Sequence, residues 1–163
     1  MALHLVRKAR ASDIDDIGRI EQICFPIEEA ATKEQITERM KCFGNHFYVM
    51  EYVGSIVGFI NGMVTEEETI SDEMYENILF HNEDGRWQTV FGLGVINGYR
   101  KKGFATMLMR ELIEDSRKEK RDGVILTCKE NLIPFYEGLG FRNQGVSKSV
   151  HGGAVWYDMR LLF

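Results

Sequence analysis

Three cations and a glycine stand together where a helix is expected to begin. Arg100, Lys101 and Lys102 are followed directly by Gly103, and an amphipathic pattern starts at Phe104. The first turn of a helix has backbone N–H groups without partners and carries the positive end of the helix dipole, so it attracts anions. A glycine lets the backbone approach a ligand closely, and the cations add charge for a multiply anionic group. The stretch predicts a diphosphate-binding loop, and a solvated cationic surface loop is the alternative that the local residues leave open.

Two other nucleotide-binding motifs fit the sequence less well. It contains no GxxxxGK[S/T] pattern, which argues against a P-loop nucleotidase. Gly92, Gly94 and Gly98 approach a dinucleotide-binding fingerprint, but the expected helix begins only after Gly103, so the tight βαβ unit is missing. A dinucleotide-binding oxidoreductase is therefore a less favoured alternative.

Composition is typical of an ordinary globular domain. The chain has 163 residues, of which 44% are hydrophobic and 28% charged. The net charge of -5 argues against a general nucleic-acid binder, and neither a membrane span nor a signal peptide is evident. Cys24, Cys42 and Cys128 are widely spaced without a CxxC pair, so neither a zinc knuckle nor a disulfide framework is indicated. We expect a cytoplasmic protein with reduced thiols, no metal, and no nucleic-acid or membrane partner.

Hydrophobic periodicity and turn residues place the regular elements. Strands are expected at residues 3–9, as a pair meeting near Gly54 within 46–64, and at 86–95, 124–128, 141–149 and 154–161. Helices are expected at residues 12–24, 32–40, 103–121 and 131–140. The mixed order of strands and helices predicts a single α/β or α+β domain over residues 1–163, with helices on the faces of one sheet.

Helix ends can also be assigned from the sequence. Capping boxes are predicted for the first two helices. The first pairs Ser12 with an aspartate three residues on, and the second pairs Thr32 with Gln35. Asn131 is expected to cap the last helix, and Gly140 to end it.

An acidic stretch separates the early strands from the glycine-rich one. Residues 65–85 contain eight acids and no Lys or Arg, and a short helix is expected around 71–78. The stretch is either a solvated loop, or a lid that steers a cationic amine to an acceptor site. Trp87, Trp156 and Tyr157 either line that site or belong to the core.

The loop resembles a motif of the GNAT superfamily of N-acetyltransferases. Arg100-Lys-Lys-Gly-Phe-Ala105 matches the pattern (R/Q)-x-x-G-x-(G/A), between an expected strand and a long expected helix. Downstream, NLIPFYEGLGF resembles the superfamily's N-x-x-x-x-FY-x-x-x-GF element. The chain most resembles the arylalkylamine (serotonin-type) N-acetyltransferases and their bacterial relatives, through TCKENLIPFYEGLGF and, more weakly, FPIEEAAT. The resemblance implies the GNAT fold, with a mixed, mostly antiparallel central sheet of six to seven strands flanked by about four helices.

The resemblance also implies acetyl-CoA as the acetyl donor. The backbone of Leu93, Gly94 and Val95 would pair with the pantetheine arm. The pyrophosphate would be held by the loop and the first helical turn, namely Arg100, Lys101, Lys102, Gly103, Phe104, Ala105 and Thr106. Asn131 would lie along the CoA arm, and Tyr136 aligns with the family tyrosine that faces the CoA sulfur.

Acetyl transfer to an amine requires an oxyanion site, an acid and a base. A strand N–H near Val95 can donate to the thioester oxygen, and the Tyr136 phenol can protonate the leaving thiolate. The alternative for Tyr136 is a core aromatic beside Phe135.

The base is not given by the resemblance. Serotonin-type enzymes carry two histidines on the strand before the diphosphate loop, and the matching positions here are Thr89 and Phe91. A water chain could remove the proton instead. The other candidates are His151, next to two glycines that suggest a tight turn, and Glu28 or Glu29, all three of which could equally be surface residues.

Together these features predict an acetyl-CoA-dependent N-acetyltransferase that acts by direct transfer to a primary amine. The acceptor is a small amine, an amino acid or a protein N-terminus, with small amines favoured by the resemblance alone. The alternative is a GNAT-fold module that binds acyl-CoA without turnover. The superfamily resemblance also makes a homodimer conceivable.

Overall fold

The computed structural model describes residues 3–163, which divide into two compact units. Unit 1 comprises the described chain up to Gly62 together with Gly92–Leu112, and unit 2 comprises Met63–Phe91 and Ile113–Phe163. The long helix α4 (Phe104–Lys118) is shared between them, since the boundary falls after Leu112. Within the described residues, no helix has the length and apolar character needed to cross a membrane.

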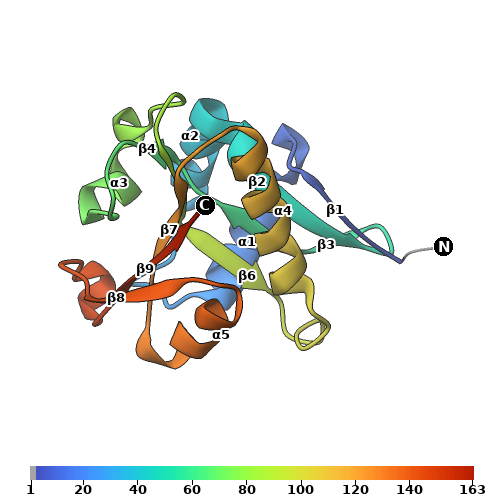
Figure 1. The fold of residues 1–163 in the computed structure, drawn as a ribbon. Helices are drawn as coiled ribbons and strands as arrows, with labels where there is room; N and C mark the ends of the chain where they lie inside the picture. The colour runs from blue at the N-terminus through green and yellow to red at the C-terminus, as the bar shows by residue number, and fades with distance from the viewer. Residues whose placement is uncertain (1–2) are drawn as a thin grey trace. The chain divides into compact units, whose positions relative to one another are not determined.

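Unit 1 is built on an antiparallel sheet of four strands in the order β1-β2-β3-β6. Its elements are β1 (His4–Lys8), η1 (Ala11–Asp13), α1 (Ile14–Cys24), α2 (Lys33–Phe43), η2 (Gly44–His46), β2 (Phe47–Tyr52), β3 (Ser55–Asn61) and β6 (Gly92–Val95), followed by the first part of α4 (Figure 1). Helix α1 packs against α2, β3 and β6. The fully buried side chains of Ile17, Ile20 and Phe59 form the core beneath α1, because apolar residues recur at helical spacing on α1 and Phe59 lies on the sheet face toward Cys24. Ile60, the next residue of β3, points to the opposite face of the sheet.

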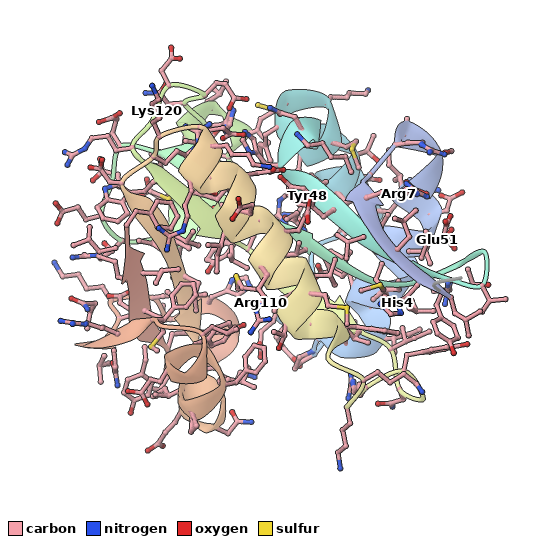
Figure 2. The ribbon with its side chains drawn as sticks, turned by 45° about the vertical axis from the view of Figure 1, so that its right-hand side comes forward. His4, Arg7, Tyr48, Glu51, Arg110 and Lys120 are labelled. Atoms are coloured by element: carbon pink, nitrogen blue, oxygen red, sulfur yellow. The ribbon has the colours of Figure 1, made fainter. Side chains whose placement is uncertain are left out.

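Arg7 on β1 holds Asp13, the residue directly before α1, in place. Its guanidinium donates to both carboxylate oxygens of Asp13, at 2.8 and 3.0 Å, and lies 3.5 Å from the Glu51 carboxylate on the neighbouring strand β2 (Figure 2). The hydrogen bond from Arg7 lowers the pKa of Asp13. The same carboxylate accepts from the Arg10 N–H at 2.8 Å, so it orders the turn that begins the helix.

Unit 2 is built on a mixed sheet of five strands in the order β4-β5-β7-β9-β8. Its elements are β4 (Val64–Thr65), α3 (Asp72–Glu76), η3 (Ile78–Phe80), β5 (Trp87–Val90), β7 (Gly123–Cys128), η4 (Glu130–Leu132), α5 (Ile133–Gly138), β8 (Arg142–Val146), η5 (His151–Gly153) and β9 (Tyr157–Leu162). β5 and β7 are parallel, whereas the other neighbouring strands of the sheet are antiparallel. Helix α5 packs against β8 (Figure 1).

The α/β class and most predicted elements are confirmed, but one strand prediction is wrong. Residues 86–95 form two strands, β5 and β6, that belong to different sheets and are interrupted at Phe91. β5 and β6 are both extended and have similar residue patterns, so the local sequence does not separate them. β5 pairs with β7, and β6 pairs with β3. These partners are distant in sequence, and they determine the sheet to which each strand belongs. The strands therefore form two sheets rather than one.

The predicted caps had mixed outcomes. The capping box of Thr32 and Gln35 is confirmed, with hydrogen bonds of 3.1 and 2.8 Å in the two directions. The Ser12 cap is wrong, because Ser12 lies inside η1 and the Asp13 side chain orders the turn instead. The Asn131 cap is also wrong, because Asn131 lies in η4 and Leu132 stands at the N-cap of α5.

Candidate active site

The loop before α4 offers backbone N–H groups to an anion. The Met107 N–H donates to the Gly103 carbonyl at 3.0 Å, so the N–H groups of residues 104–106 have no partner inside the helix. Gly103 has a φ of +82°, and a Cβ there would meet only the Met107 Cε at 3.9 Å. Lys101, with a φ of +63°, and Lys102 are exposed. This open loop, with exposed cations at the positive end of a helix dipole, is suited to phosphate.

Phe104 anchors the start of α4 within unit 1. Its side chain is buried, with its ring centroid 5.5 Å from His4 and 5.7 Å from Tyr52. Phe104 is among the residues predicted to hold the pyrophosphate, and its buried side chain leaves only its backbone available for that role. Ala105 and Thr106 follow in the same turn and are half-buried.

Arg100 braces the loop against the neighbouring strand. Its Nε donates to the Val95 carbonyl at 2.7 Å, and one terminal nitrogen lies 3.8 Å from Cys24 Sγ. These contacts orient the guanidinium toward β6, although Arg100 is exposed like Lys101 and Lys102. We infer that Arg100 shapes the loop, while the lysines supply its outward charge.

The end strand β6 presents part of its backbone away from β3. The Ile96 N–H donates to the Val57 carbonyl at 3.0 Å, which marks a hydrogen-bonded pair. Because such pairs alternate along an antiparallel ladder, Gly94 bonds toward β3, whereas the N–H groups of Leu93 and Val95 point to the open edge. This register favours Leu93 and Val95 over Gly94 as the residues whose backbone could bind a ligand arm.

Close packing explains the glycine between them. A Cβ on Gly94 would lie 3.1 Å from Cys24 Sγ and 3.2 Å from a Phe59 ring carbon. A side chain at this position would therefore require Cys24 or Phe59 to shift by a few tenths of an ångström.

A buried carboxyl of α1, Glu21, was not predicted as a site residue. It is 5% exposed, and its Oε2 accepts from the Ala31 N–H at 3.1 Å, while Gln22 donates to the Ala31 carbonyl at 3.1 Å. Its Oε1 would lie 3.3 Å from a Cβ placed on Gly92. Burial raises the pKa of Glu21 to about 7, partly offset by the Ala31 hydrogen bond and by Arg39. Its position four residues after Ile17, on the apolar face of the helix, was the sequence signal for a buried acid.

The glutamates considered as bases lie in the turn that Glu21 and Gln22 secure. Glu28 is exposed and Glu29 half-buried, in a turn where the Glu29 N–H donates to the Pro26 carbonyl at 2.9 Å.

Tyr136 of unit 2 is buried in an aromatic cluster. It is 7% exposed, with edge-on contacts to Phe135 and Phe141 at centroid distances of 5.0 and 5.8 Å. Burial raises the pKa of the phenol, and nearby Cys128 and Tyr75 raise it further. The FY-x-x-x-GF spacing is explained by the Phe141 N–H, which donates to the Tyr136 carbonyl at 3.1 Å across the turn that ends α5.

Asn131 lines an open pocket of unit 2. The pocket has a volume of about 590 Å³ and is lined by Lys129, Glu130, Asn131, Ala154, Val155 and Tyr157. Of the three aromatic residues considered for an acceptor site, Tyr157 borders this pocket. Trp87 is buried in the core, 5.4 Å from the Arg160 guanidinium carbon, and Trp156 is half-buried.

The imidazole of His151 stacks on the ring of Tyr75, a contact that the sequence did not indicate. The imidazole is 4.8 Å from the Tyr75 ring with an interplanar angle of 21°, and the Tyr75 hydroxyl is 2.9 Å from Thr127 Oγ1. The predicted tight turn after His151 is confirmed, with φ values of +62° at Gly152 and +73° at Gly153. Nothing in the local pattern of the acidic stretch predicts that Tyr75 contacts His151.

The two positions that align with the family histidines have structural roles. Thr89 is buried, and both its N–H and its hydroxyl donate to the Met63 carbonyl at 2.9 Å. Phe91 packs its ring 4.8 Å from Tyr75. Neither side chain can accept a proton from an amine, so the structure gives these positions no base.

The predicted site residues thus fall into two groups. Unit 1 holds the backbone and cation group, from Leu93 to Thr106, and unit 2 holds the side-chain group of Tyr136, Asn131 and His151. Each group is a local arrangement that can do one part of the chemistry: anion binding in the first, and proton transfer in the second.

Comparison with known proteins identifies the class. The fold is similar to that of Arabidopsis thaliana Naa50, solved in complex with the bisubstrate analogue CoA-Ac-MVNAL, with a TM-score of 0.77, 15% identity, and coverage of 99% of this chain and 100% of that one. The sequence matches the Acetyltransferase (GNAT) family over residues 14–141. The chain belongs to this family, which does not support the dinucleotide-binding alternative.

Two curated relatives can be compared with the chain. The chain is 26% identical to serotonin N-acetyltransferase of Mesocricetus auratus over 108 residues, covering 66% of this chain and 51% of that protein. It is 27% identical to an N-alpha-acetyltransferase of Saccharolobus solfataricus over 150 residues, covering 90% of this chain and 84% of that protein. The chain spans about half the length of the first of these relatives and most of the second.

Proposed function

We propose that the protein is an N-acetyltransferase that moves the acetyl group of acetyl-CoA to a primary amine by direct transfer. The observation that carries this proposal is the loop at the start of α4, where Gly103 leaves open space beside N–H groups and exposed lysines. Membership of the GNAT family and the CoA-based ligand of the Naa50 structure support it.

The donor would be held mainly by backbone. The N–H groups of residues 103–106, with Lys101 and Lys102, would bind the diphosphate of CoA. The outward N–H groups of Leu93 and Val95 would bind the pantetheine arm, and the Val95 N–H would polarise the thioester carbonyl. Asn131 would contact the CoA arm from unit 2.

Tyr136 and His151 would transfer the protons. The amine nitrogen attacks the carbonyl carbon, so that a C–N bond forms as the C–S bond breaks. His151 would accept the proton that the amine loses, and Tyr136 would donate its phenolic proton to the leaving thiolate. Burial raises the pKa of Tyr136 and so favours the protonated phenol, the form that can donate a proton.

The acceptor belongs to one of the classes named by the relatives. Serotonin N-acetyltransferase points to small amines, whereas the archaeal N-alpha-acetyltransferase and the Naa50 analogue point to protein N-termini. We keep primary amines as the proposed class.

The first test is thermal unfolding with and without acetyl-CoA, with NADPH as the control. A ligand that binds only the folded state raises Tm when its concentration is well above Kd. We expect a rise with acetyl-CoA alone, followed by thiol release when small amines and short peptides are added. No shift at millimolar acetyl-CoA would contradict the proposed donor site.

The structural roles of Thr89 and Phe91 favour one second candidate, a GNAT-fold module that binds acyl-CoA without turnover. It predicts the same shift in Tm but no thiol release above the uncatalysed rate with any amine. A rate that falls in Tyr136→Phe at unchanged acetyl-CoA binding would exclude this candidate.

A further inference from the structure

The short helix α3 is attached by its first residue to the segment that precedes His151. The Asp72 carboxylate accepts from the Ser149 hydroxyl and from the Val150 N–H, the latter at 3.0 Å. The His151 N–H in turn donates to the Ser149 hydroxyl at 3.3 Å. Asp72 is therefore connected to the His151 backbone through one side chain.

Tyr75, one turn further along α3, contacts the His151 side chain itself. Its ring stacks on the imidazole at 4.8 Å, and Phe91 supports the ring on another side at 4.8 Å. The Tyr75 hydroxyl is hydrogen-bonded to Thr127 Oγ1 on β7 at 2.9 Å. These contacts fix both the plane and the position of the ring on which the imidazole lies.

A third contact holds the far side of the turn. The Trp156 indole N–H donates to the His151 carbonyl at 2.8 Å, and its ring lies 6.1 Å from the imidazole. The Lys129 ammonium lies 5.6 Å from the centre of the same indole. His151 is thus held through its N–H, its carbonyl and its ring, although it lies in a loop with two glycines at positive φ.

The same tyrosine connects His151 with Tyr136. The Tyr75 phenol is close enough to the Tyr136 phenol to raise its pKa, as is the Cys128 thiol at the end of β7. Tyr75 therefore stacks on the proposed base and acts electrostatically on the proposed acid, and all three residues belong to unit 2.

We propose that Tyr75 and Asp72 are positioning residues, which hold the His151 imidazole in the orientation needed to accept the proton of the acceptor amine. The inference rests on the proposed function. It gives the acidic stretch a specific role: α3 supplies the support for a base that the strand positions Thr89 and Phe91 do not provide.

The test is steady-state kinetics of the full chain in three Tyr75 and Thr127 variants. Tyr75→Phe keeps the stacked ring and loses the hydrogen bond, and Thr127→Val removes the same bond from the other side. Tyr75→Leu removes the ring. Misplacing a catalytic group lowers kcat by one to two powers of ten, so we expect Tyr75→Leu to lose at least about tenfold in kcat with the KM for acetyl-CoA unchanged. We expect Tyr75→Phe and Thr127→Val to stay within about threefold of the parent chain.

A double-mutant cycle separates positioning from a loss of structure. If Tyr75 acts through His151, then Tyr75→Leu should lower kcat hardly any further in a chain that already carries His151→Gln. Asp72→Asn alone should lower kcat by less than Tyr75→Leu does, and it too should lower kcat hardly any further when His151→Gln is present. NMR of the His151 imidazole gives a readout without turnover: the ring-current shift should be kept in Tyr75→Phe and lost in Tyr75→Leu.

The outcomes are distinguishable. Equal losses of kcat for Tyr75→Leu in both backgrounds would overturn the positioning role and leave the acetyltransferase proposal standing. An unchanged kcat in Tyr75→Leu would do the same. A parent chain that binds acetyl-CoA but acetylates no amine would overturn both proposals, since there would be no proton transfer to position.

Discussion

The two groups of candidate residues are built in different ways. In unit 1, the loop before α4 and the strand β6 present backbone N–H groups, and the side chains there pack or brace, as Phe104 and Arg100 do. In unit 2, the proposed chemistry would depend on side chains that come from α3, α5 and η5. A backbone site requires glycines and a helix start in one short stretch, whereas a side-chain site requires the tertiary packing of several segments.

This difference has consequences for mutation. A backbone site tolerates changes of side chain unless they fill the space or reverse the charge. A side-chain site loses function with single-atom changes but retains binding of a ligand held elsewhere. The predictions below test that contrast in order of decreasing effect.

Substitution of Gly103 should have the largest effect. Gly103→Asp places a carboxylate at the start of α4, where the proposed site attracts an anion, and adds a Cβ at a φ of +82°. We expect the affinity for acetyl-CoA to fall by at least about 100-fold, measured by calorimetry, because repulsion replaces attraction at the diphosphate. Tm should change by only a few degrees, since the position is open.

Two controls accompany that variant. Gly103→Ala adds the Cβ without the charge and should retain most of the affinity. Arg110→Ala removes an exposed cation on the same helix, away from its first turn (Figure 2), and should leave affinity unchanged. Wild-type affinity in Gly103→Asp would show that the loop does not bind the diphosphate.

Unlike the backbone groups of the loop and β6, Glu21 of unit 1 is a buried ionisable side chain. Its substitution should change the free energy of unfolding. The folded-state pKa of about 7 lies above the ordinary glutamate pKa of 4.5, so the folded chain holds this proton more tightly than the unfolded chain. The resulting stability is fully present below pH 4.5 and is lost as the pH rises to about 7. Glu21→Gln should therefore be more stable than the parent chain by roughly 2 to 3 kcal/mol at pH 8, and similar to it near pH 4.

Chemical denaturation of both chains across this pH range measures the difference directly. The comparison with the variant cancels the contributions of other groups, among them Asp13, whose lowered pKa acts in the opposite sense. A difference in unfolding free energy that does not change with pH would show that the Glu21 carboxyl is not buried in the manner described.

Tyr136→Phe tests the side-chain group of unit 2. The change removes one oxygen and keeps the ring between Phe135 and Phe141. General-acid groups contribute about 10²- to 10⁴-fold, and water can replace part of this, so we expect kcat to fall by about 10- to 100-fold. The KM for acetyl-CoA should stay the same. A loss of acetyl-CoA binding equal to the loss of kcat would mean that Tyr136 serves binding rather than proton transfer.

The contrast between the units also explains what the sequence could predict. The glycine-containing turn at Gly103 and the Thr32 cap depend on residues within one short stretch, and local chemistry indicates them, whereas the GNAT fold was predicted only through the resemblance of two motifs. The interruption of the strand at Phe91 depends on pairing with β3 and β7, which no local pattern contains. The failed Ser12 cap has a similar cause, because Asp13 is recruited by Arg7 of the preceding strand.

The two residues that were not predicted, Glu21 and Tyr75, show the same difference between local and tertiary signals. Glu21 could have been noted, since an acid on the apolar face of a helix indicates burial. Tyr75 could not, because its position in an acidic stretch says nothing of the His151 turn, which lies far along the chain. His151 itself was indicated only by its two neighbouring glycines, and the side chains that hold it were not.

The smallest expected effect concerns the exposed lysines of the loop. Lys101→Ala with Lys102→Ala removes two charges but leaves the N–H groups and Gly103 in place. Exposed charge pairs contribute up to about 1 kcal/mol each, so the double variant should lose roughly 3- to 30-fold in acetyl-CoA affinity at low salt. Because added salt screens exposed charges, the parent and double variant should converge as ionic strength rises toward 1 M. If backbone N–H groups dominate the site, the affinity that remains at high salt will be the same in both chains. A difference that persists at high salt would instead mean that a lysine makes a specific, desolvated contact, and that the unit 1 group is not essentially a backbone site.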